Sequence, residues 1–470
     1  MTDDLQQRLD LVARNHSFSD GLVERFGHWV RTAEDSELFR VGVVQWAESH
    51  GVDEDEAIDL FLHATKAGIF EMSWGVLCPK CGMLVTTPGG LKALGPNPHC
   101  QLCRLDYPAT LDDQVEITFS VEPAIRSLRY YDPKRVDDKR DYFKIFFSPS
   151  FELTDKQHQM MSNIDAVIRL RPGETGRLEF TSSEGLYGLI CPTVHAVTFA
   201  SALEGERREI SLEVHDGMCI PKNTALGLGP VSVAVDNRTD YIITVCAYNF
   251  GPHRPEDMPY TQFTMRPFLT GKRMLTNQTF RDLFRTQTIG GSGLRLKNLT
   301  IVFTDLEAST ALYERVGDLR ALELVREHFA RLHEVVSRHR GALVKTIGDA
   351  VMAAFGEPER ALAAAAGMNR SMRRIDADGE RLRVNVGVHS GACVAIQTNH
   401  QIDYFGSAVN MAARVQGAAK GGEILVTEAV FNAPGVAGLT EDLGLQETRD
   451  VIELKGVAEP VVVHRLLPAG

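Results

Sequence analysis

The sequence predicts a multidomain α+β protein, and three observations lead to this expectation. The chain has 470 residues, enough for about two to four domains. Apolar residues follow a helical spacing over the first 75 residues, whereas short runs typical of strands dominate the middle of the chain. Strand-like and helix-like segments then alternate. We expect helices over 1–75, a cysteine-rich ribbon over 76–110, a β-sandwich over 111–270, a linker over 271–297 and an α+β domain over 298–470.

Charge and hydropathy exclude several classes of function. The formal net charge of −12 argues against general binding to nucleic acids or to anionic membranes. The segment Met1–Leu5 lacks the basic and apolar regions of a secretory signal, and no apolar run approaches the roughly 20 residues that span a bilayer. We therefore expect a cytoplasmic protein with no membrane insertion and no nucleic-acid partner.

The first part is expected to contain helices at Glu37–Glu48 and Glu54–Ala67 and a strand at Ile69–Leu77, in a winged-helix-like order. Asp53–Glu56 is a run of acids, which the dipole of a helix favours in its first turn, with Asp53 as the cap. The charge does not indicate DNA binding, so we expect this part to serve packing.

Two Cys-x-x-Cys pairs predict a structural zinc site. Cys78 and Cys81 form one pair, Cys100 and Cys103 form the other, and 18 residues separate them, as in a zinc ribbon. Four thiolates would complete a closed tetrahedral shell around one Zn²⁺. A redox dithiol is the alternative, and His99 is interpreted as a solvated side chain rather than a ligand.

The middle of the chain has the pattern of an antiparallel β-sandwich. Short strand-like runs recur between turns rich in Gly, Pro and Asn, for example at Ala166–Leu170 and Tyr241–Ala247. The residues with metal-binding side chains match no ligand spacing and are interpreted as core or surface residues: His195, His215, Cys191, Cys219 and Cys246. We expect this region to be regulatory, with a ligand that the sequence does not identify.

The last part contains two acids at the ends of predicted strands. Leu299–Thr304 is a buried-type strand that ends at Asp305. Asp349 lies in a two-residue turn, after Gly348, within a hairpin over 342–355. Two carboxylates at strand ends can hold hard cations such as Mg²⁺.

The order of elements around these acids is strand, helix, hairpin, helix, strand, which is a ferredoxin-like core. We expect helices at 318–340 and 357–373 and a strand at Leu382–Ser390. A turn over Leu306–Thr310 leads into a helix whose first backbone amides can hold phosphate. The apolar stripe of the 318–340 helix is expected to comprise Leu319, Leu322, Val325, Phe329, Leu332, Val335 and Val336.

Five motifs in a fixed order make residues 298–466 similar to the catalytic domain of class III nucleotidyl cyclases. These motifs are Phe303–Leu306, Lys345–Asp349, Asp403–Gly406, Val409–Arg414 and Leu454–Gly456. The preceding 290 residues resemble an uncharacterised module that is fused to such cyclases, and this resemblance implies no role for them.

The resemblance implies a role for each motif residue in the conversion of ATP to 3′,5′-cyclic AMP and pyrophosphate. Asp305, Asp349 and the Leu306 carbonyl would hold two Mg²⁺ or Mn²⁺ ions. Arg414 would stabilise charge on the α-phosphoryl group and Asn410 would orient the ribose. Lys455 would contact the terminal phosphates, with Thr310 in the phosphate-binding turn.

The base is expected to be adenine. Lys345 can donate to adenine N1, and Asp403 can accept from the N6 amino group, whereas guanine reverses both groups. Guanylate-making relatives usually carry Glu and Cys at this pair. The alternatives are a catalytically silent nucleotide-binding signalling protein and a guanylate cyclase.

The resemblance also implies a head-to-tail homodimer with two equivalent sites, because family members place the acids and the base-binding pair on different chains. Three features depart from the family pattern. Ala308 replaces a common Gly, which we regard as mild because Ala is small; Ala392 replaces a common Arg; and the segment Gln397–Gln401 is short.

Overall fold

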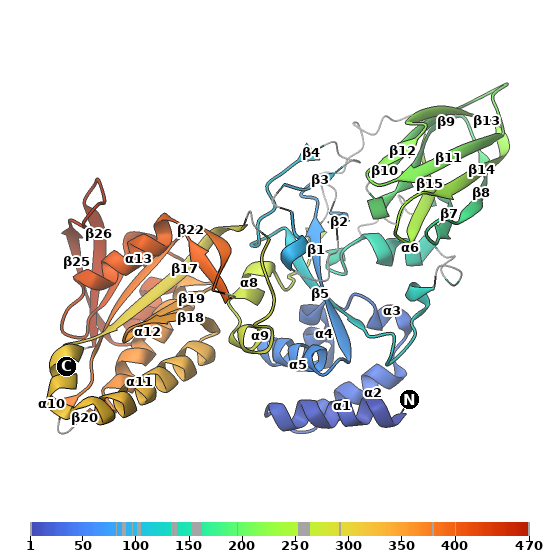
Figure 1. Ribbon diagram of the computed structural model, residues 1–470. Helices are drawn as coiled ribbons and strands as arrows, with labels where there is room; N and C mark the ends of the chain where they lie inside the picture. Colours follow the sequence, from blue (N-terminus) through green and yellow to red (C-terminus); the bar gives the residue numbers. More distant parts are fainter. Residues whose placement is uncertain are drawn as a thin grey trace. The chain divides into compact units, whose positions relative to one another are not determined.

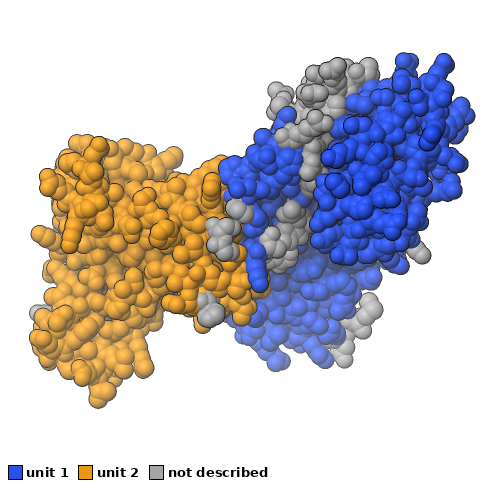
Figure 2. Space-filling model, turned by 45° about the horizontal axis from the view of Figure 1, so that its top comes forward, with its two compact units in different colours: residues 1–109, 114–269 blue, residues 110–113, 270–470 orange. Residues whose placement is uncertain are grey.

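The computed structural model describes residues 2–80, 82–86, 91–95, 97–100, 105–132, 135, 139–152, 162–194, 196–251, 264–290, 293–377, 380–399 and 401–468. The chain divides into two compact units, which Figure 2 shows in different colours. Unit 1 comprises residues 1–109 and 114–269, and unit 2 comprises residues 110–113 and 270–470.

Unit 1 begins with five helices: α1 (Thr2–Asn15), α2 (Leu22–Thr32), α3 (Asp35–Leu38), α4 (Val43–His50) and α5 (Glu54–Lys66). The Asp53 side chain accepts hydrogen bonds from the backbone N–H groups of Asp55 and Glu56, so the predicted cap is confirmed. The single helix predicted over 37–48 is wrong. Arg40 adopts a left-handed φ of 49°, and Val41 forms a β-bridge to Phe119, so the chain is extended between α3 and α4.

A three-stranded sheet follows, in the order β2 (Leu84–Thr86), β1 (Phe70–Leu77) and β5 (Val115–Val121). The run predicted at 114–119 as part of the sandwich therefore pairs with β1 instead, because its side chains are buried against that strand. The smaller elements of this part are η1 (Leu91–Ala93), β3 (His99–Cys100), β4 (Leu105–Asp106), η2 (Arg129–Tyr131), α6 (Lys139–Phe146), β6 (Phe151–Glu152) and β16 (Thr264–Met265).

Two facing sheets form the sandwich of unit 1. One has the order β13 (Asn223–Gly227), β10 (Ala196–Leu203), β9 (Gly185–Cys191), β15 (Ile243–Gly251) and β7 (Ile164–Leu170), with η4 (Pro192–Val194) after β9. The other has the order β12 (Met218–Ile220), β11 (Glu209–His215), β14 (Gly229–Asn237) and β8 (Thr175–Ser182). The purely antiparallel arrangement predicted is wrong, because β10 pairs with β13 and β11 with β14 in parallel. Alternation of apolar and polar residues indicates that one face of a strand is buried. It does not indicate whether the neighbouring strands are parallel or antiparallel.

Unit 2 is built on one sheet of ferredoxin-like topology. The four core strands lie in the order β18 (Gly341–Ile347), β19 (Ala350–Phe355), β17 (Leu294–Leu306) and β22 (Val384–Thr398). This is the order predicted from the strand, helix, hairpin, helix, strand pattern. The sheet continues through β24 (Ile424–Thr427), β26 (Val461–Pro468) and β25 (Leu445–Ile452), and β23 (Gln401–Phe405) pairs with β22. A separate two-stranded sheet consists of β20 (Asp376–Ala377) and β21 (Glu380–Arg381).

Helices cover both faces of this sheet, as Figure 1 shows. Val302, Val386 and Val426 face a core shared with α11 (Asp318–Arg338) and α12 (Pro358–Met372). The opposite face carries α13 (Ser407–Ala418). The remaining helices of unit 2 are α8 (Gly271–Leu275), α9 (Gln278–Leu283), α10 (Ser309–Val316), α14 (Glu428–Phe431) and α15 (Val436–Asp442).

Part of the stripe predicted for α11 is wrong. Leu319 is 83% exposed and Leu322 is also exposed, whereas Ala321, Leu324 and His328 are buried. The buried residues Ala321, Leu324, His328 and Leu332 follow one another at helical spacing, so the buried face of the helix passes through the small Ala321 and not through Leu319 and Leu322. Tertiary contact therefore selected a different face from the one that the leucines alone indicated.

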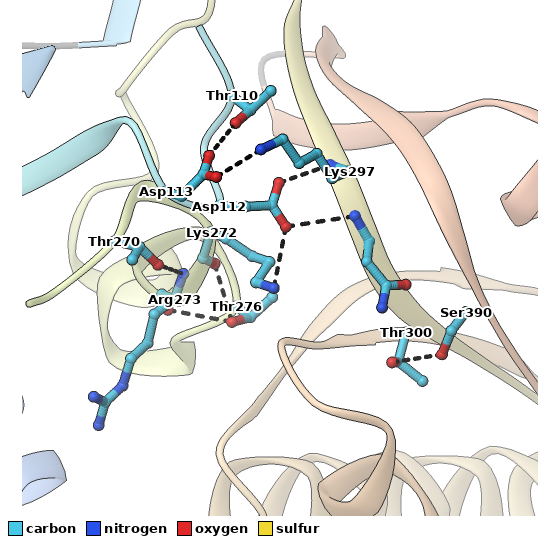
Figure 3. Close-up of polar contacts among 11 residues, drawn as sticks. Thr110, Asp112, Asp113, Thr270, Lys272, Arg273, Thr276, Lys297, Thr300 and Ser390 are labelled. Atoms are coloured by element: carbon cyan, nitrogen blue, oxygen red, sulfur yellow. Dashed lines mark hydrogen bonds and ion pairs between the residues drawn. The ribbon is translucent and has the colours of Figure 1, made fainter. Parts of the chain in front are cut away.

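Two segments from outside the α+β core belong to unit 2. Residues 110–113 run parallel to the start of β17, where Leu111 N–H donates to Arg295 O at 3.0 Å. Asp112 accepts from the Lys297 N–H at 2.7 Å and pairs with Lys272 of α8 at 3.1 Å (Figure 3). These contacts lie beside a register shift between Leu296 and Leu299, so Asp112 satisfies a backbone donor at the irregularity. Residues 271–297, for which the sequence predicts a linker, therefore form α8, α9 and the start of β17.

Within the described residues, no helix is long and apolar enough to cross a membrane.

A glycine determines how closely α13 approaches β22. A Cβ on Gly387 would overlap the backbone N and Cα of Gln416 in α13. We expect Gly387→Ala to lower the free energy of unfolding of unit 2 by about 1–3 kcal/mol, because helix and strand must separate. Gly438→Ala in α15 is the matched control, since its Cβ meets nothing within 4 Å. Chemical denaturation of both variants measures the difference, and equal stability of the two would contradict this packing.

Candidate functional site

The two predicted acids meet at one end of the sheet. β17 pairs with β19 so that Thr304 lies opposite Val351, which brings Asp305 beside the hairpin turn that holds Asp349. Gly348 precedes Asp349 with a φ of 63°, a conformation that suits Gly at a tight turn. Burial, and then the charge of Asp349, raise the pKa of Asp305. The Asp349 carboxylate is therefore close enough to disfavour the ionised form of Asp305.

This arrangement fits a divalent cation. The Asp349 Oδ2 atom is buried and has no hydrogen-bond partner among the described residues. A cation between the two carboxylates would satisfy that oxygen and remove the repulsion. In the described part of the chain, no group of three or more His, Cys, Asp or Glu residues could hold a metal ion. Two carboxylates alone are typical of Mg²⁺, which keeps water and substrate phosphates as its other ligands.

Two residues that the sequence analysis missed lie near Asp349. His328 Nε2 lies 3.1 Å from the Asp349 carbonyl oxygen and donates to it, and burial lowers the pKa of His328 so that the ring stays neutral. Tyr313 of α10 has a buried hydroxyl without a partner among the described residues, and burial followed by the charges of Asp349 and Asp305 raises the pKa of Tyr313. The position of His328 four residues before Leu332, at helical spacing, was the available signal.

The predicted base-binding pair is brought together. Lys345 Nζ lies 2.6 Å from Asp403 Oδ2, although 57 residues separate the two in sequence. Asp403 is largely buried, and its Oδ1 accepts from the Tyr404 N–H at 2.8 Å. Lys345 comes from β18 and Asp403 from β23, so the pair bridges two strands that the sequence places far apart.

The predicted phosphate-binding residues lie on and beside α13. Asn410 is exposed one helical turn before Arg414. A Cβ on Gly456 would lie 3.2 Å from Arg414 Nη2, so the guanidinium is close to the loop that carries Lys455. Lys455 itself is exposed. Arg414 and Lys455 thus share one region of unit 2, and the close approach of α13 to β22 holds Arg414 there.

The turn after β17 differs from the expectation in one respect. Leu306 is buried at the end of β17, and Thr310 is exposed in the first turn of α10, as the predicted phosphate-binding turn requires. Ala308 adopts φ 54° and ψ 32°, which is the left-handed region. The exchange of Gly for Ala is therefore not mild, because the backbone conformation and not the side-chain volume favours Gly here.

Half of the predicted zinc site is described. Cys78 and Cys100 are buried, whereas Cys81 and Cys103 lie outside the described residues. His99 Nδ1 pairs with Asp106 at 2.8 Å and is partly exposed, in keeping with a solvated side chain.

The other sulfur and imidazole groups of unit 1 agree with a structural role. Cys191 and Cys219 are part of the sandwich core, Cys246 is buried, and burial raises the pKa of Cys219 to about 12. His215 pairs with Glu213 at 3.0 Å, and His195 lies outside the described residues.

Two relatives illustrate which known proteins the chain is similar to. It is 29% identical over 207 residues to receptor-type adenylate cyclase GRESAG 4.3 of Trypanosoma brucei brucei, covering 36% of this chain and 17% of the relative. It is 32% identical over 166 residues to adenylate cyclase 2 of Rhizobium meliloti (strain 1021), covering 32% of this chain and 46% of the relative. The chain thus spans less than half the length of either relative.

Solved structures of cyclases match a similar share of the chain. A Trypanosoma brucei adenylate cyclase in its monomeric state is 28% identical with a TM-score of 0.33, covering 36% of this chain and 89% of that one. The adenylyl cyclase CyaB from P. aeruginosa is 23% identical with a TM-score of 0.32, covering 37% of this chain and 96% of that one.

Two protein families account for almost the whole length. Residues 2–282 match a family of unknown function, DUF5939, which is more than half of the chain. Residues 294–466 match the adenylate and guanylate cyclase catalytic domain. The chain therefore belongs to the DUF5939 family and carries an adenylate and guanylate cyclase catalytic domain in its C-terminal part.

Proposed function

We propose that the protein is an adenylate cyclase, which converts ATP to 3′,5′-cyclic AMP and pyrophosphate at a site shared by two copies of the chain. The observation that carries this proposal is the pairing of Lys345 with Asp403 at 2.6 Å in the domain that also brings Asp305 and Asp349 together. The reaction needs a pair of side chains that recognises the base and a site that binds the cations, and this cyclase domain has candidates for both.

The Lys345–Asp403 pair favours adenine over guanine. Without substrate, each side chain satisfies the other. Adenine can replace both contacts, because its N1 accepts from the Lys345 ammonium and its N6 amino group donates to the Asp403 carboxylate. Guanine presents an N1–H to the ammonium and a carbonyl oxygen to the carboxylate, which leaves two charged and partly buried groups opposed. Discrimination therefore arises from unpaired polar groups and not from the size of the base.

Each remaining site residue has one task. Asp305, Asp349 and the Leu306 carbonyl would hold two Mg²⁺ or Mn²⁺ ions, which lower the pKa of the ribose 3′-hydroxyl and stabilise the leaving pyrophosphate when bound. Asn410 would orient the ribose so that O3′ lies in line with the α-phosphorus. Arg414 would donate to the α-phosphoryl oxygens as charge develops there. Lys455 and the turn around Thr310 would bind the terminal phosphates.

Two alternative functions can be distinguished from an adenylate cyclase. A catalytically silent nucleotide-binding protein would be expected to lack a metal-binding Asp or Arg414, and the sequence retains Asp305, Asp349 and Arg414. A guanylate cyclase is disfavoured by Lys345 and Asp403.

The N-terminal modules are proposed to regulate the enzyme. The outer face of the sandwich carries a hollow of about 780 Å³ lined by polar and charged side chains, among them Arg177, Arg207, Glu209 and Ser232. This hollow is the place where an unidentified regulatory ligand is expected. The ribbon with Cys78, Cys81, Cys100 and Cys103 would bind one structural Zn²⁺.

The preference for adenine is tested by replacing both Lys345 and Asp403. The wild-type protein with Mn²⁺ should form cyclic AMP from ATP and little cyclic GMP from GTP. The double variant Lys345→Glu, Asp403→Cys should lose most of its activity with ATP and gain activity with GTP, because donors and acceptors are then reversed. Chromatographic analysis of the products from each nucleotide measures this. Unchanged base preference in the double variant would rule out the pair as the reader.

The shared site is tested by complementation. Asp349→Ala and Arg414→Ala should each be almost inactive, since loss of one charge-stabilising donor alone lowers the rate by roughly 10²–10³. An equimolar mixture should recover about a quarter of wild-type activity, because half of the dimers are mixed and each has one intact site of two. Activity is measured after subunit exchange has been verified by mass spectrometry. No recovery in exchanged dimers would argue for sites within single chains.

The zinc ribbon is tested by metal analysis. Full-length protein prepared without chelators should contain about one zinc per chain, and Cys100→Ser should reduce both the zinc content and the melting temperature, because structural zinc binding contributes to folding. Cys393→Ser in unit 2, which replaces another buried cysteine, is the control and should keep its zinc. Metal-free wild-type protein with an unchanged melting temperature would refute the site.

A further inference from the structure

Residues 275–281, which precede β17 in the chain, contact the strand that carries Lys345. Gln278, the first residue of α9, accepts a hydrogen bond through Oε1 from the Leu343 N–H at 2.7 Å. The register between β18 and β19 shifts between Leu343 and Lys345, so this contact satisfies a donor at the irregularity. Gln278 is buried, and its loss would leave the Leu343 donor unsatisfied two residues before the base-reading lysine.

The same segment holds the strand that carries Asp403, on both sides of that residue. Arg281 of α9 donates from Nη2 to the carbonyl oxygen of Ile402 at 2.5 Å. The Tyr404 hydroxyl donates to the carbonyl oxygen of Leu275 at 3.2 Å, and the Arg281 guanidinium lies 5.9 Å from the Tyr404 ring centroid. Both neighbours of Asp403 in β23 are therefore bound by residues of the segment 275–281.

A buried aromatic residue anchors this segment. Phe280 is fully buried and stacks with Phe284 at a centroid separation of 5.5 Å. Asn277 caps α9 by accepting from the Phe280 N–H at 2.7 Å. The segment is therefore a defined part of unit 2, able to determine the spacing of two strands that are not neighbours in the sheet.

We propose that Gln278 and Arg281 are positioning residues for purine recognition. They hold β18 and β23 at the separation at which Lys345 Nζ and Asp403 Oδ2 fit N1 and N6 of adenine, and they contact no nucleotide. This inference rests on the proposed function and extends it, because it assigns base specificity to residues that precede the catalytic-domain match at 294–466 and lie within the DUF5939 match at 2–282.

The physical basis is the short range of hydrogen bonding. Lys345 and Asp403 can read adenine only if their charged atoms stay within hydrogen-bond distance of two ring positions at once. When Arg281 is lost, the Ile402 carbonyl oxygen loses this donor, and β23 is held only by its pairing with β22 and by the Tyr404 hydroxyl, so it can shift more easily. A displacement of even 1 Å weakens both contacts to adenine and relieves the opposition to guanine, so selectivity falls more than general nucleotide affinity.

The test measures binding and does not require turnover. Full-length wild type, Arg281→Gln and Arg285→Gln are titrated calorimetrically with the α,β-methylene analogues of ATP and GTP. Arg285 is the matched control, since it lies four residues further along, is 73% exposed and pairs only loosely with Asp282 at 3.6 Å. We expect Arg281→Gln to lower the ATP-to-GTP affinity ratio by about tenfold, Arg281→Lys to restore part of it, and Arg285→Gln to leave it unchanged.

A second variant covers the case in which Arg281→Gln does not fold. Gln278→Leu removes the acceptor for the Leu343 N–H while keeping a side chain of similar size, and it should lower the same ratio together with the melting temperature, because a buried donor is left unsatisfied. A ratio equal to that of wild type in a folded Arg281→Gln or Gln278→Leu protein overturns the inference, as does a wild type that binds both analogues equally. Cyclic AMP formation is assayed separately: its absence in wild type would refute the proposed function, while the affinity ratio would still decide the positioning role.

Discussion

The register between β17 and β19 is the constraint on which the catalytic unit depends. Pairing of Thr304 with Val351 places the end of one strand beside the tip of a hairpin, and so forces Asp305 and Asp349 together. Burial, and then the charge of Asp349, raise the pKa of Asp305, and the Asp349 Oδ2 atom has no hydrogen-bond partner among the described residues, so this proximity is unfavourable without a counter-ion. A one-residue slip would move every core side chain of the strand to the other face, so burial of the sheet maintains the repulsion. Stability of the fold thus supports a locally strained site.

The catalytic unit extends beyond the segment that matches the cyclase domain. Residues 110–113 form a β-bridge to β17, and Asp112 satisfies backbone donors where the register of β17 shifts. Residues 270–284 contribute α8 and α9, which contact both base-reading strands. Residues 110–113 and 270–282 lie within the DUF5939 match, so the family boundary at residue 282 does not coincide with the structural boundary. The DUF5939 part of the chain is in this sense a component of the catalytic unit.

The structure brings together residues that the sequence analysis selected, because they belong to short motifs with distinctive order. Asp305, Asp349, Lys345 and Asp403 lie where strands end or begin, and those ends follow from local pattern. His328, Tyr313, Gln278 and Arg281 were missed because each acts through a contact far away in sequence. A buried histidine in a helix and a glutamine at a helix start have ordinary local explanations, and only their partners reveal another role.

The sequence by itself determined the kinds of element and their order, since hydrophobic period, caps and turn residues act over a few positions. It was sufficient for the hairpin at Gly348, the cap at Asp53 and the ferredoxin-like order of strands. Only the tertiary structure decided which face of α11 is buried, that β10 and β11 have parallel neighbours, that α3 and α4 are separate, and that Ala308 is left-handed. These outcomes depend on packing between segments distant in the chain, where the free energy of burying a face outweighs local preference.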